Sequence, residues 1–357
     1  MSAVFQFGSK TTPDEPDDPK PNWTPEDLMD RAQKAIDVCE PELAVRFMRR
    51  ASEAAPEDAS ILDQLAEVEM GVGETERAGR AWMRAIEVSG NPDHDANAER
   101  WLYVAQLREG NGARESYEHG LRLLTARLQA MQASMVHEEG SSESDIRAQM
   151  CTAYCAVAEL YLTDLCLEES AEEACQNALN KAMEFNANES HEPMQGLASL
   201  RLSQGMHAEA ANLMHSAYER IKSCGHAMDP ELRISTARLL LECAPNVSQC
   251  ADDALDLLMD SKREDDENVE IWFLMGVGFY QQSPPDLTLA YEYLERAKEM
   301  LEKVREALLQ ENEPFPYEVQ LRLVGEQMKL VEAAALEYPP DSNEGDDNTD
   351  GTFEMED

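Results

Sequence analysis

Carboxylates are the most abundant side chains in this sequence that could do chemistry. The 357 residues include 72 Asp and Glu against 30 Lys and Arg, which gives a formal net charge of −42. Such an excess attracts a basic partner at long range and in a salt-dependent way. It disfavours binding to a nucleic-acid backbone, which needs clustered cations, and adhesion to anionic lipid. The first hypothesis is therefore a carboxylate surface for a cationic protein.

Catalytic and metal-binding motifs are absent from the sequence. There is no G-x-S-x-G, P-loop, H-E-x-x-H or EF-hand pattern, and no acid–base pair stands out among so many carboxylates. The seven histidines are scattered, and none stands beside a cysteine at a spacing typical of metal ligands. We therefore expect no enzyme activity, no metal and no cofactor.

The eight cysteines are spread along segments with helical character. Cys151 and Cys155 stand one helical turn apart, but no C-x-x-C occurs and the spacings do not form a compact disulfide framework. Reduced, buried thiols are the expected state, which suits cytosol or nucleus. The opening residues, MSAVFQFGSK, lack the features of an export signal. We therefore expect the protein in the cytoplasm and nucleus.

The longest apolar run, IWFLMGVGFY from Ile271 to Tyr280, raises the question of a membrane segment. It has ten residues, whereas a spanning helix needs roughly 18 or more uncharged apolar residues. Two glutamines and a Pro-Pro pair follow it closely. We therefore expect no membrane span, and the run must belong to the folded body of the protein.

Composition divides the chain into three parts. Residues 1–24 contain prolines and the acidic cluster DEPDD, which predicts a disordered arm. Residues 337–357 are predicted to form a disordered acidic tail, because the stretch from Asp341 to Asp357 holds eight carboxylates and no cation. Residues 25–336 are rich in Ala, Leu, Glu and Met, with apolar residues at helical spacing and almost no strand signals. The body is therefore predicted to be all-helical.

A repeat of 34 residues organises this body. A small–large–small stripe begins at Ala44, with Met48 as its large member. The same stripe recurs 34 residues later from Ala78, with Trp82 as its large member. Small residues at these positions let paired helices approach closely, and the large one fills the gap between neighbouring repeats.

The apolar run matches the first helix of such a repeat. Trp272, Met275, Gly276 and Phe279 reproduce the spacing W-x2-L-G-x2-Y, in which the third residue is a packing glycine. The chain thus resembles the tetratricopeptide-repeat family. The resemblance implies an all-α, right-handed superhelical solenoid of about seven helix pairs over residues 25–336, closed by a C-terminal capping helix.

In that family, positions 2, 5, 9, 12 and 13 of each repeat face a concave groove. Carried over by register, these positions imply an acidic groove with apolar patches, suited to an extended basic segment with a few apolar anchors. The implied partner-binding residues are Asp37, Asp63, Glu67, Met70, Glu99, Leu102, Glu109, Glu159, Glu192, Glu270, Phe273, Val277 and Tyr280, with Met29, Glu231 and Glu242 as further positions. The alternative is that these acids form an ordinary solvated face.

Some tetratricopeptide domains clamp the C-terminal Glu-Glu-Val-Asp of Hsp70 and Hsp90 with Lys, Asn and Arg side chains. Here positions 5 and 9 of the second repeat are Asp63 and Glu67, so the sign of the charge is inverted. We therefore expect no clamp for the Hsp70 or Hsp90 peptide.

A closer resemblance rests on the stretches ESYEHGLRLL, ALNKAMEF and LASLRLSQGMHAEAANLM, together with the repeat number and the acidic tail. The chain is similar to a fungal and plant family of dedicated assembly chaperones for large-subunit ribosomal protein 4. The resemblance implies an ATP-independent chaperone that shields its client's basic loop in the groove and accompanies it to the nuclear pre-60S ribosome. We expect a monomer. A scaffold subunit of a multiprotein complex, or a chaperone of another basic client such as a histone, remain alternatives.

Overall fold

The computed structural model describes residues 23–133, 142–186, 190–224 and 229–337. These residues form fifteen α-helices and one short 3-10 helix and contain no strand, so the all-helical prediction is confirmed. The chain forms two compact units, residues 1–138 and 139–357, which are described separately. The predicted arm (1–24) and tail (337–357) lie outside the described residues, except for Trp23, Thr24 and Glu337.

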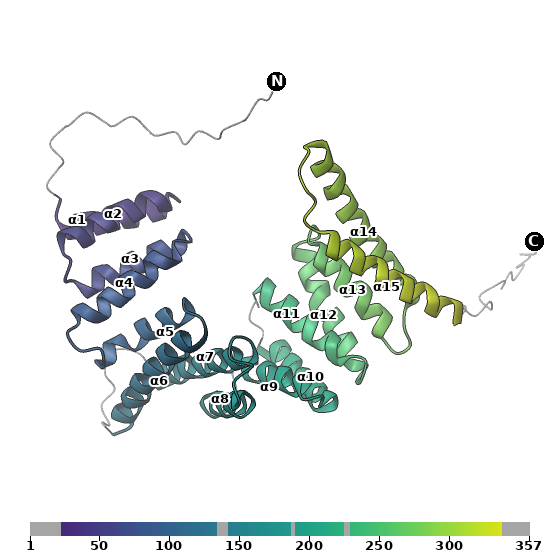
Figure 1. Cartoon of the computed structure of the whole chain (residues 1–357), viewed down its shortest axis with the longest axis horizontal. Helices are drawn as coiled ribbons and strands as arrows, with labels where there is room; N and C mark the ends of the chain where they lie inside the picture. The colour runs from purple at the N-terminus through teal and green to yellow at the C-terminus, as the bar shows by residue number, and fades with distance from the viewer. Residues whose placement is uncertain (1–22, 134–141, 187–189, 225–228, 338–357) are drawn as a thin grey trace, which may run out of the picture. The chain divides into compact units, whose positions relative to one another are not determined.

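The first unit contains three helix pairs. They are α1 (Pro25–Asp37) with α2 (Pro41–Ala54), α3 (Ala59–Gly71) with α4 (Thr75–Val88), and α5 (Ala98–Gln106) with α6 (Gly110–Ala133). The 3-10 helix η1 (Asp95–Asn97) directly precedes α5. Each helix packs against the next along the chain, so the pairs stack in sequence order (Figure 1).

The second unit contains four helix pairs and a final helix. The pairs are α7 (Glu143–Leu162) with α8 (Ala171–Phe185), α9 (Glu192–Ser203) with α10 (His207–Cys224), α11 (Pro230–Cys243) with α12 (Gln249–Glu264), and α13 (Val269–Gln281) with α14 (Leu287–Gln310). Helix α15 (Glu318–Glu337) packs against α14 and α13, as expected of a capping helix. The described residues thus contain the seven pairs and the cap that the repeat pattern predicts.

The small–large–small stripes of α2 and α4 lie in the apolar core of the first unit. Ala44 and Met48 are buried on α2, and Ala78 and Trp82 are buried on α4. All four belong to one apolar cluster of the first unit, which also receives side chains from α1 and α3. The stripe therefore marks the face on which a second helix meets its neighbours.

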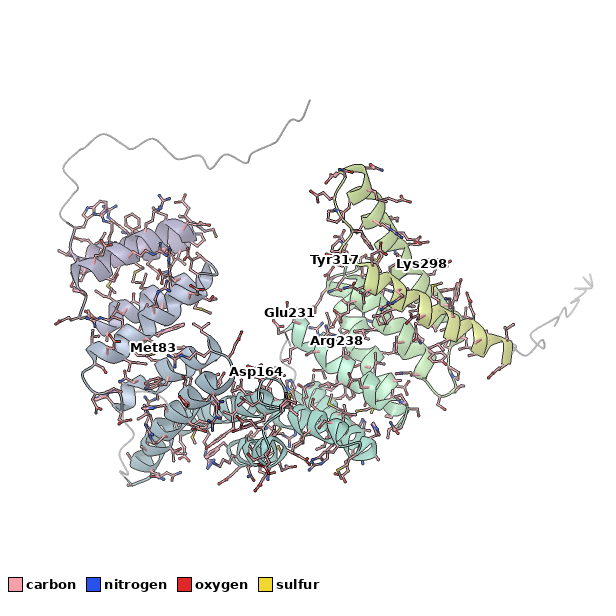
Figure 2. The ribbon with its side chains drawn as sticks, viewed as in Figure 1. Met83, Asp164, Glu231, Arg238, Lys298 and Tyr317 are labelled. Carbon is pink, nitrogen blue, oxygen red and sulfur yellow. The ribbon has the colours of Figure 1, made fainter. Side chains whose placement is uncertain are left out.

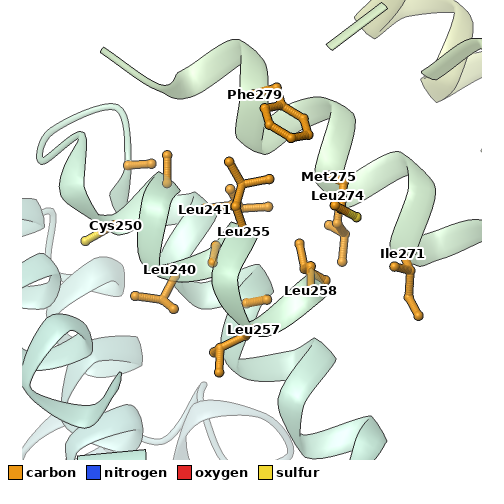
Figure 3. Close-up of a cluster of buried hydrophobic side chains, with 14 of the residues drawn as sticks. Leu240, Leu241, Cys250, Leu255, Leu257, Leu258, Ile271, Leu274, Met275 and Phe279 are labelled. Carbon is orange, nitrogen blue, oxygen red and sulfur yellow. The ribbon is translucent and has the colours of Figure 1, made fainter. Parts of the chain in front are cut away.

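The apolar run Ile271–Tyr280 forms most of α13. Its Leu274, Met275 and Phe279 side chains are buried in a cluster with residues of α11 and α12 (Figure 3). Burial among neighbouring repeats explains the apolar character of this helix. No helix in the described parts of the chain is long and apolar enough to cross a membrane.

Two glycines let α13 approach helices on two sides. A Cβ atom on Gly276 would lie 2.6 Å from Leu294 Cγ and 3.1 Å from the backbone oxygen of Ala290, both on α14. A Cβ atom on Gly278 would lie 2.8 Å from Leu255 Cδ2 on α12. The absence of a Cβ at Gly276 therefore lets α13 lie close to its partner helix α14. The absence of a Cβ at Gly278 lets α13 lie close to α12 of the preceding pair.

This contact predicts the effect of one methyl group. Gly276→Ala should lower the free energy of unfolding by about 1–3 kcal/mol, because the added Cβ meets both a side chain and a backbone oxygen. Gly325→Ala is the matched control: it also lies inside a helix, but no atom stands within 4 Å of its added Cβ. The control should be neutral or stabilising by up to about 1 kcal/mol. Urea unfolding followed by circular dichroism measures both, and equal midpoints would contradict the packing role of Gly276.

Candidate functional site

In the first unit, carboxylates of two neighbouring first helices gather around one tyrosine. Asp63 and Glu67 lie on α3, and Glu99 lies on α5 with Tyr103. Burial raises the pKa of Tyr103, and the negative charges of these three carboxylates raise it further. The ring of Tyr103 is 40 % exposed and stacks on Trp82 with the centroids 4.8 Å apart. An exposed aromatic ring among carboxylates can contact both apolar and cationic groups of a partner.

Two of these carboxylates are already held by arginines of the same chain. Arg100 Nε donates to Asp63 Oδ1 at 2.8 Å, and its Nη2 donates to Oδ2 at 2.6 Å. Arg127 Nη1 donates to Glu99 Oε1 at 2.6 Å. Such two-pronged or short charged hydrogen bonds between well-covered groups are stronger than ordinary surface ion pairs. Asp63 and Glu99 therefore join neighbouring helices as well as carrying negative charge.

The other predicted carboxylates of the first unit are more open. Glu67 and Glu109 are exposed, and within the described residues their side chains make no ion pair or hydrogen bond. Asp37, also exposed, accepts a hydrogen bond of 2.9 Å from Gln33 Nε2 on the same helix. These carboxylates can pair with an external cation without breaking an internal ion pair.

The predicted apolar positions of the first unit are less open than the register implies. Leu102 is only 9 % exposed, because it packs against Gly120 of α6. The exposed side chain is its neighbour Tyr103, and Leu102 itself offers a partner little surface. Met70 is partly buried against the first unit's core.

Predicted carboxylates of the second unit differ in exposure. Glu159 on α7 is exposed, and the described residues give its side chain no ion pair. Glu192 on α9 is half-buried: burial raises the pKa of this carboxyl, while a hydrogen bond with Thr152 lowers it. Glu270 on α13 forms an ion pair with Arg238 of α11. Glu159 is the most accessible of the three.

The predicted apolar residues of α13, Phe273, Val277 and Tyr280, do not share one site. Phe273 and Glu270 line one pocket of about 590 Å³ with residues of α14 and α15. Val277 and Tyr280 do not line it, and pack partly buried against the second unit's core. The sequence reasoning missed the far wall of this pocket, which includes Tyr317. The sequence signal for that wall was the presence of apolar residues, such as Leu323, on the side of the capping helix that faces away from the core.

Three of the cysteines are buried thiols with raised pKa values. Burial raises the pKa of Cys175 and Cys243 to about 11, and that of Cys250 to about 12. The expectation of buried thiols is wrong for Cys39 and Cys166, which are exposed. Nowhere in the described ranges do three or more His, Cys, Asp or Glu side chains form a group that could hold a metal ion.

Two curated proteins that are similar to this chain in sequence carry the same name. A Schizosaccharomyces pombe protein named probable assembly chaperone of rpl4 is 27% identical over 266 residues, which cover 73% of this chain and 75% of that protein. An Emericella nidulans protein of the same name is 27% identical over 272 residues, which cover 72% of this chain and 65% of the relative. No protein-family model matches the chain.

Two solved structures resemble this chain in fold. The structure of an assembly chaperone of RpL4 (Acl4, residues 1–338) is 26% identical, with a TM-score of 0.62, and the match covers 72% of this chain and 96% of that chain. A Pyrococcus horikoshii signal-transduction ATPase with a tetratricopeptide repeat sensor matches 80% of this chain and 43% of its own, at 14% identity and a TM-score of 0.51. The second likeness shows the fold alone. The chain therefore has the fold of tetratricopeptide-repeat proteins, and it is similar in sequence and fold to proteins named assembly chaperones of RpL4.

Proposed function

We propose that this protein is a dedicated, ATP-independent assembly chaperone of large-subunit ribosomal protein 4. The observation that carries the proposal is the match to proteins of that name along 73% of the chain. The open carboxylates Glu67, Glu109 and Glu159 on or beside first helices support it, because they offer unpaired negative charge to a basic client.

Electrostatics explains how such a surface would protect its client. A ribosomal protein needs clustered cations to bind rRNA, and the same cations bind other nucleic acids without selectivity. A carboxylate surface occupies those cations until rRNA, with its denser charge, displaces it. One exposed ion pair contributes only about 0–1 kcal/mol, so useful affinity requires many pairs and a few buried anchors. Repeated first helices can provide this number of contacts.

The remaining parts of the proposal follow from this role. The protein acts as a monomer without catalysis, shields the client's extended basic loop, and accompanies it from cytoplasm to nucleus for delivery to the pre-60S ribosome. It binds neither nucleic acid nor membrane directly. It does not take the C-terminal peptide of Hsp70 or Hsp90, because the face around Tyr103 is negative where such a clamp is positive.

Two alternatives predict different partners. A scaffold or adaptor subunit should retain several stoichiometric partners when the endogenous protein is purified, whereas a dedicated chaperone should retain one newly made basic client. A chaperone of another basic protein, such as a histone, should bind that protein at least as tightly as ribosomal protein 4. Competition between the two clients decides this alternative.

The main prediction concerns salt. The isolated basic loop of ribosomal protein 4 should bind the full chain, and the dissociation constant should rise steeply between 50 and 300 mM salt, because exposed ion pairs are screened. Titration calorimetry at several salt concentrations measures this. The same ribosomal protein without its loop is the control and should bind more weakly. Absence of binding at low salt, or affinity independent of salt, would remove the proposal.

A second prediction separates open from internally paired carboxylates. Glu67→Lys with Glu109→Lys should weaken client binding roughly 5- to 30-fold at low salt and leave the melting temperature unchanged, because neither carboxylate has an internal partner. Asp63→Lys should instead lower the melting temperature, because it puts a second cation beside the largely buried Arg100 in place of its carboxylate partner.

The control for this series is Glu76→Lys on the second helix α4, where the side chain is 91 % exposed and its nearest cation, on Arg80, lies at 3.7 Å. This variant makes the same charge change as Glu67→Lys alone, but away from the first helices, and should bind the client nearly as well as the native chain. If it weakens binding as much as the Glu67 and Glu109 changes together, only net charge matters, and the assignment of the site to the first helices is wrong.

A further inference from the structure

The pocket beside Phe273 lies wholly within the second unit. It is formed where the start of α13 meets the later part of α14 and the beginning of α15, and its volume is about 590 Å³. Most of its lining is apolar. The apolar lining includes Phe273, Leu301, Val304, Tyr317, Leu323 and Val324.

Part of this lining is open to solvent in the free protein. Val304 is 39 % exposed, Tyr317 43 % and Leu323 45 %. Tyr317 stands just before α15 at the edge of this region (Figure 2). Large apolar side chains are normally covered, and a cluster of exposed ones around a concave site indicates binding. The volume is in the range of ligand pockets and exceeds that of one side chain.

A run of carboxylates immediately precedes the first lining residue of this pocket in the chain. The run from Glu264 to Glu267 contains four successive carboxylates and directly precedes Asn268, which lines the pocket. Glu264 pairs with Arg233 at 3.0 Å. Asp265, Asp266 and Glu267 are exposed, and their carboxylates make no ion pair within the described residues. The site therefore combines an apolar floor with an acidic edge.

We propose that this pocket binds one bulky aliphatic or aromatic side chain of a segment rich in Lys and Arg, while the cations beside it pair with the acidic run. The inference rests on the proposed function and adds an anchor subsite to it. Charge complementarity selects this occupant. The chain's own tail, with eight carboxylates from Asp341 to Asp357, and a second copy, with a net charge of −42, would both bring like charge to the acidic edge.

A buried apolar side chain would add binding free energy that salt does not screen. Exposed ion pairs contribute little each and weaken with salt, whereas burial of an apolar side chain does not depend on screening. Burying one Leu-sized side chain should tighten binding about 10- to 100-fold. The pocket should thus let the protein choose among basic segments that carry similar charge.

The test uses the full chain and two synthetic peptides of twelve residues. Both contain the same Lys, Arg and Ser residues, and they differ in one central position, which is Leu in one peptide and Ser in the other. The native protein should bind the Leu peptide at least tenfold more tightly, and this ratio should persist as salt weakens both. The double variant Val304→Ser/Leu323→Ser should bind both peptides equally, with an unchanged melting temperature because both side chains are exposed.

Leu330→Ser is the matched control. Leu330 lies on α15 with Leu323 and is 51 % exposed, but it does not line the pocket. This variant should keep the preference for the Leu peptide. If it loses the preference as Val304→Ser/Leu323→Ser does, the contact is a diffuse apolar surface and the pocket assignment is wrong.

The remaining outcomes separate this inference from the proposed function. Equal, salt-dependent binding of both peptides by the native chain would overturn the anchor and leave the chaperone proposal standing. No binding of either peptide at low salt would overturn both. Tighter binding of the Leu peptide by Phe353→Ser would show that the tail occupies the pocket. A dimer that Val304→Ser/Leu323→Ser dissociates would show a second copy there, and either result overturns the proposal.

Discussion

Close contact between the two helices of each pair is the constraint on which the rest of this structure depends. Gly276 shows it most directly, because there is no space for a methyl group between α13 and α14. Close-packed interiors transmit such a constraint to neighbouring side chains. Once one side of a first helix is fixed against its partner and another against the adjacent pair, a single strip remains open to solvent. Packing of small residues therefore decides where this acidic protein displays its charge.

Charge is the second determinant, and its excess has a structural cost. Like charges on stacked helices repel one another, which disfavours the compact state. The first unit places Arg100 against Asp63 and Arg127 against Glu99, in each case from a neighbouring helix or repeat. The second unit places Arg238 against Glu270 in the same manner. Arg100 and Arg238 thus join neighbouring first helices, and Arg127 joins the two helices of one pair. Among the described residues, several other carboxylates have no internal cation.

The fold could be predicted from the sequence because its signals are local. Small residues at Ala44 and Ala78 recur at a fixed step, and each stripe lies within one helix pair. The site could be predicted only in part. The contact between Asp63 and Arg100 spans 37 positions and depends on side-chain conformations that no local pattern contains. The low exposure of Leu102 likewise depends on its contact with Gly120 of α6, 18 positions along the chain, which no local pattern contains.

Arg100 also shows which carboxylates around Tyr103 are open to a partner. Its guanidinium donates to both oxygens of Asp63, a two-pronged contact that the point charge of a lysine does not reproduce. The protein thus carries, on its own surface, a copy of the contact that an arginine from outside would make. An incoming cation of either kind must displace Arg100 to reach Asp63, whereas Glu67 is exposed and has no ion-pair partner among the described residues. The same face thus offers a partner one open carboxylate and one that is already occupied.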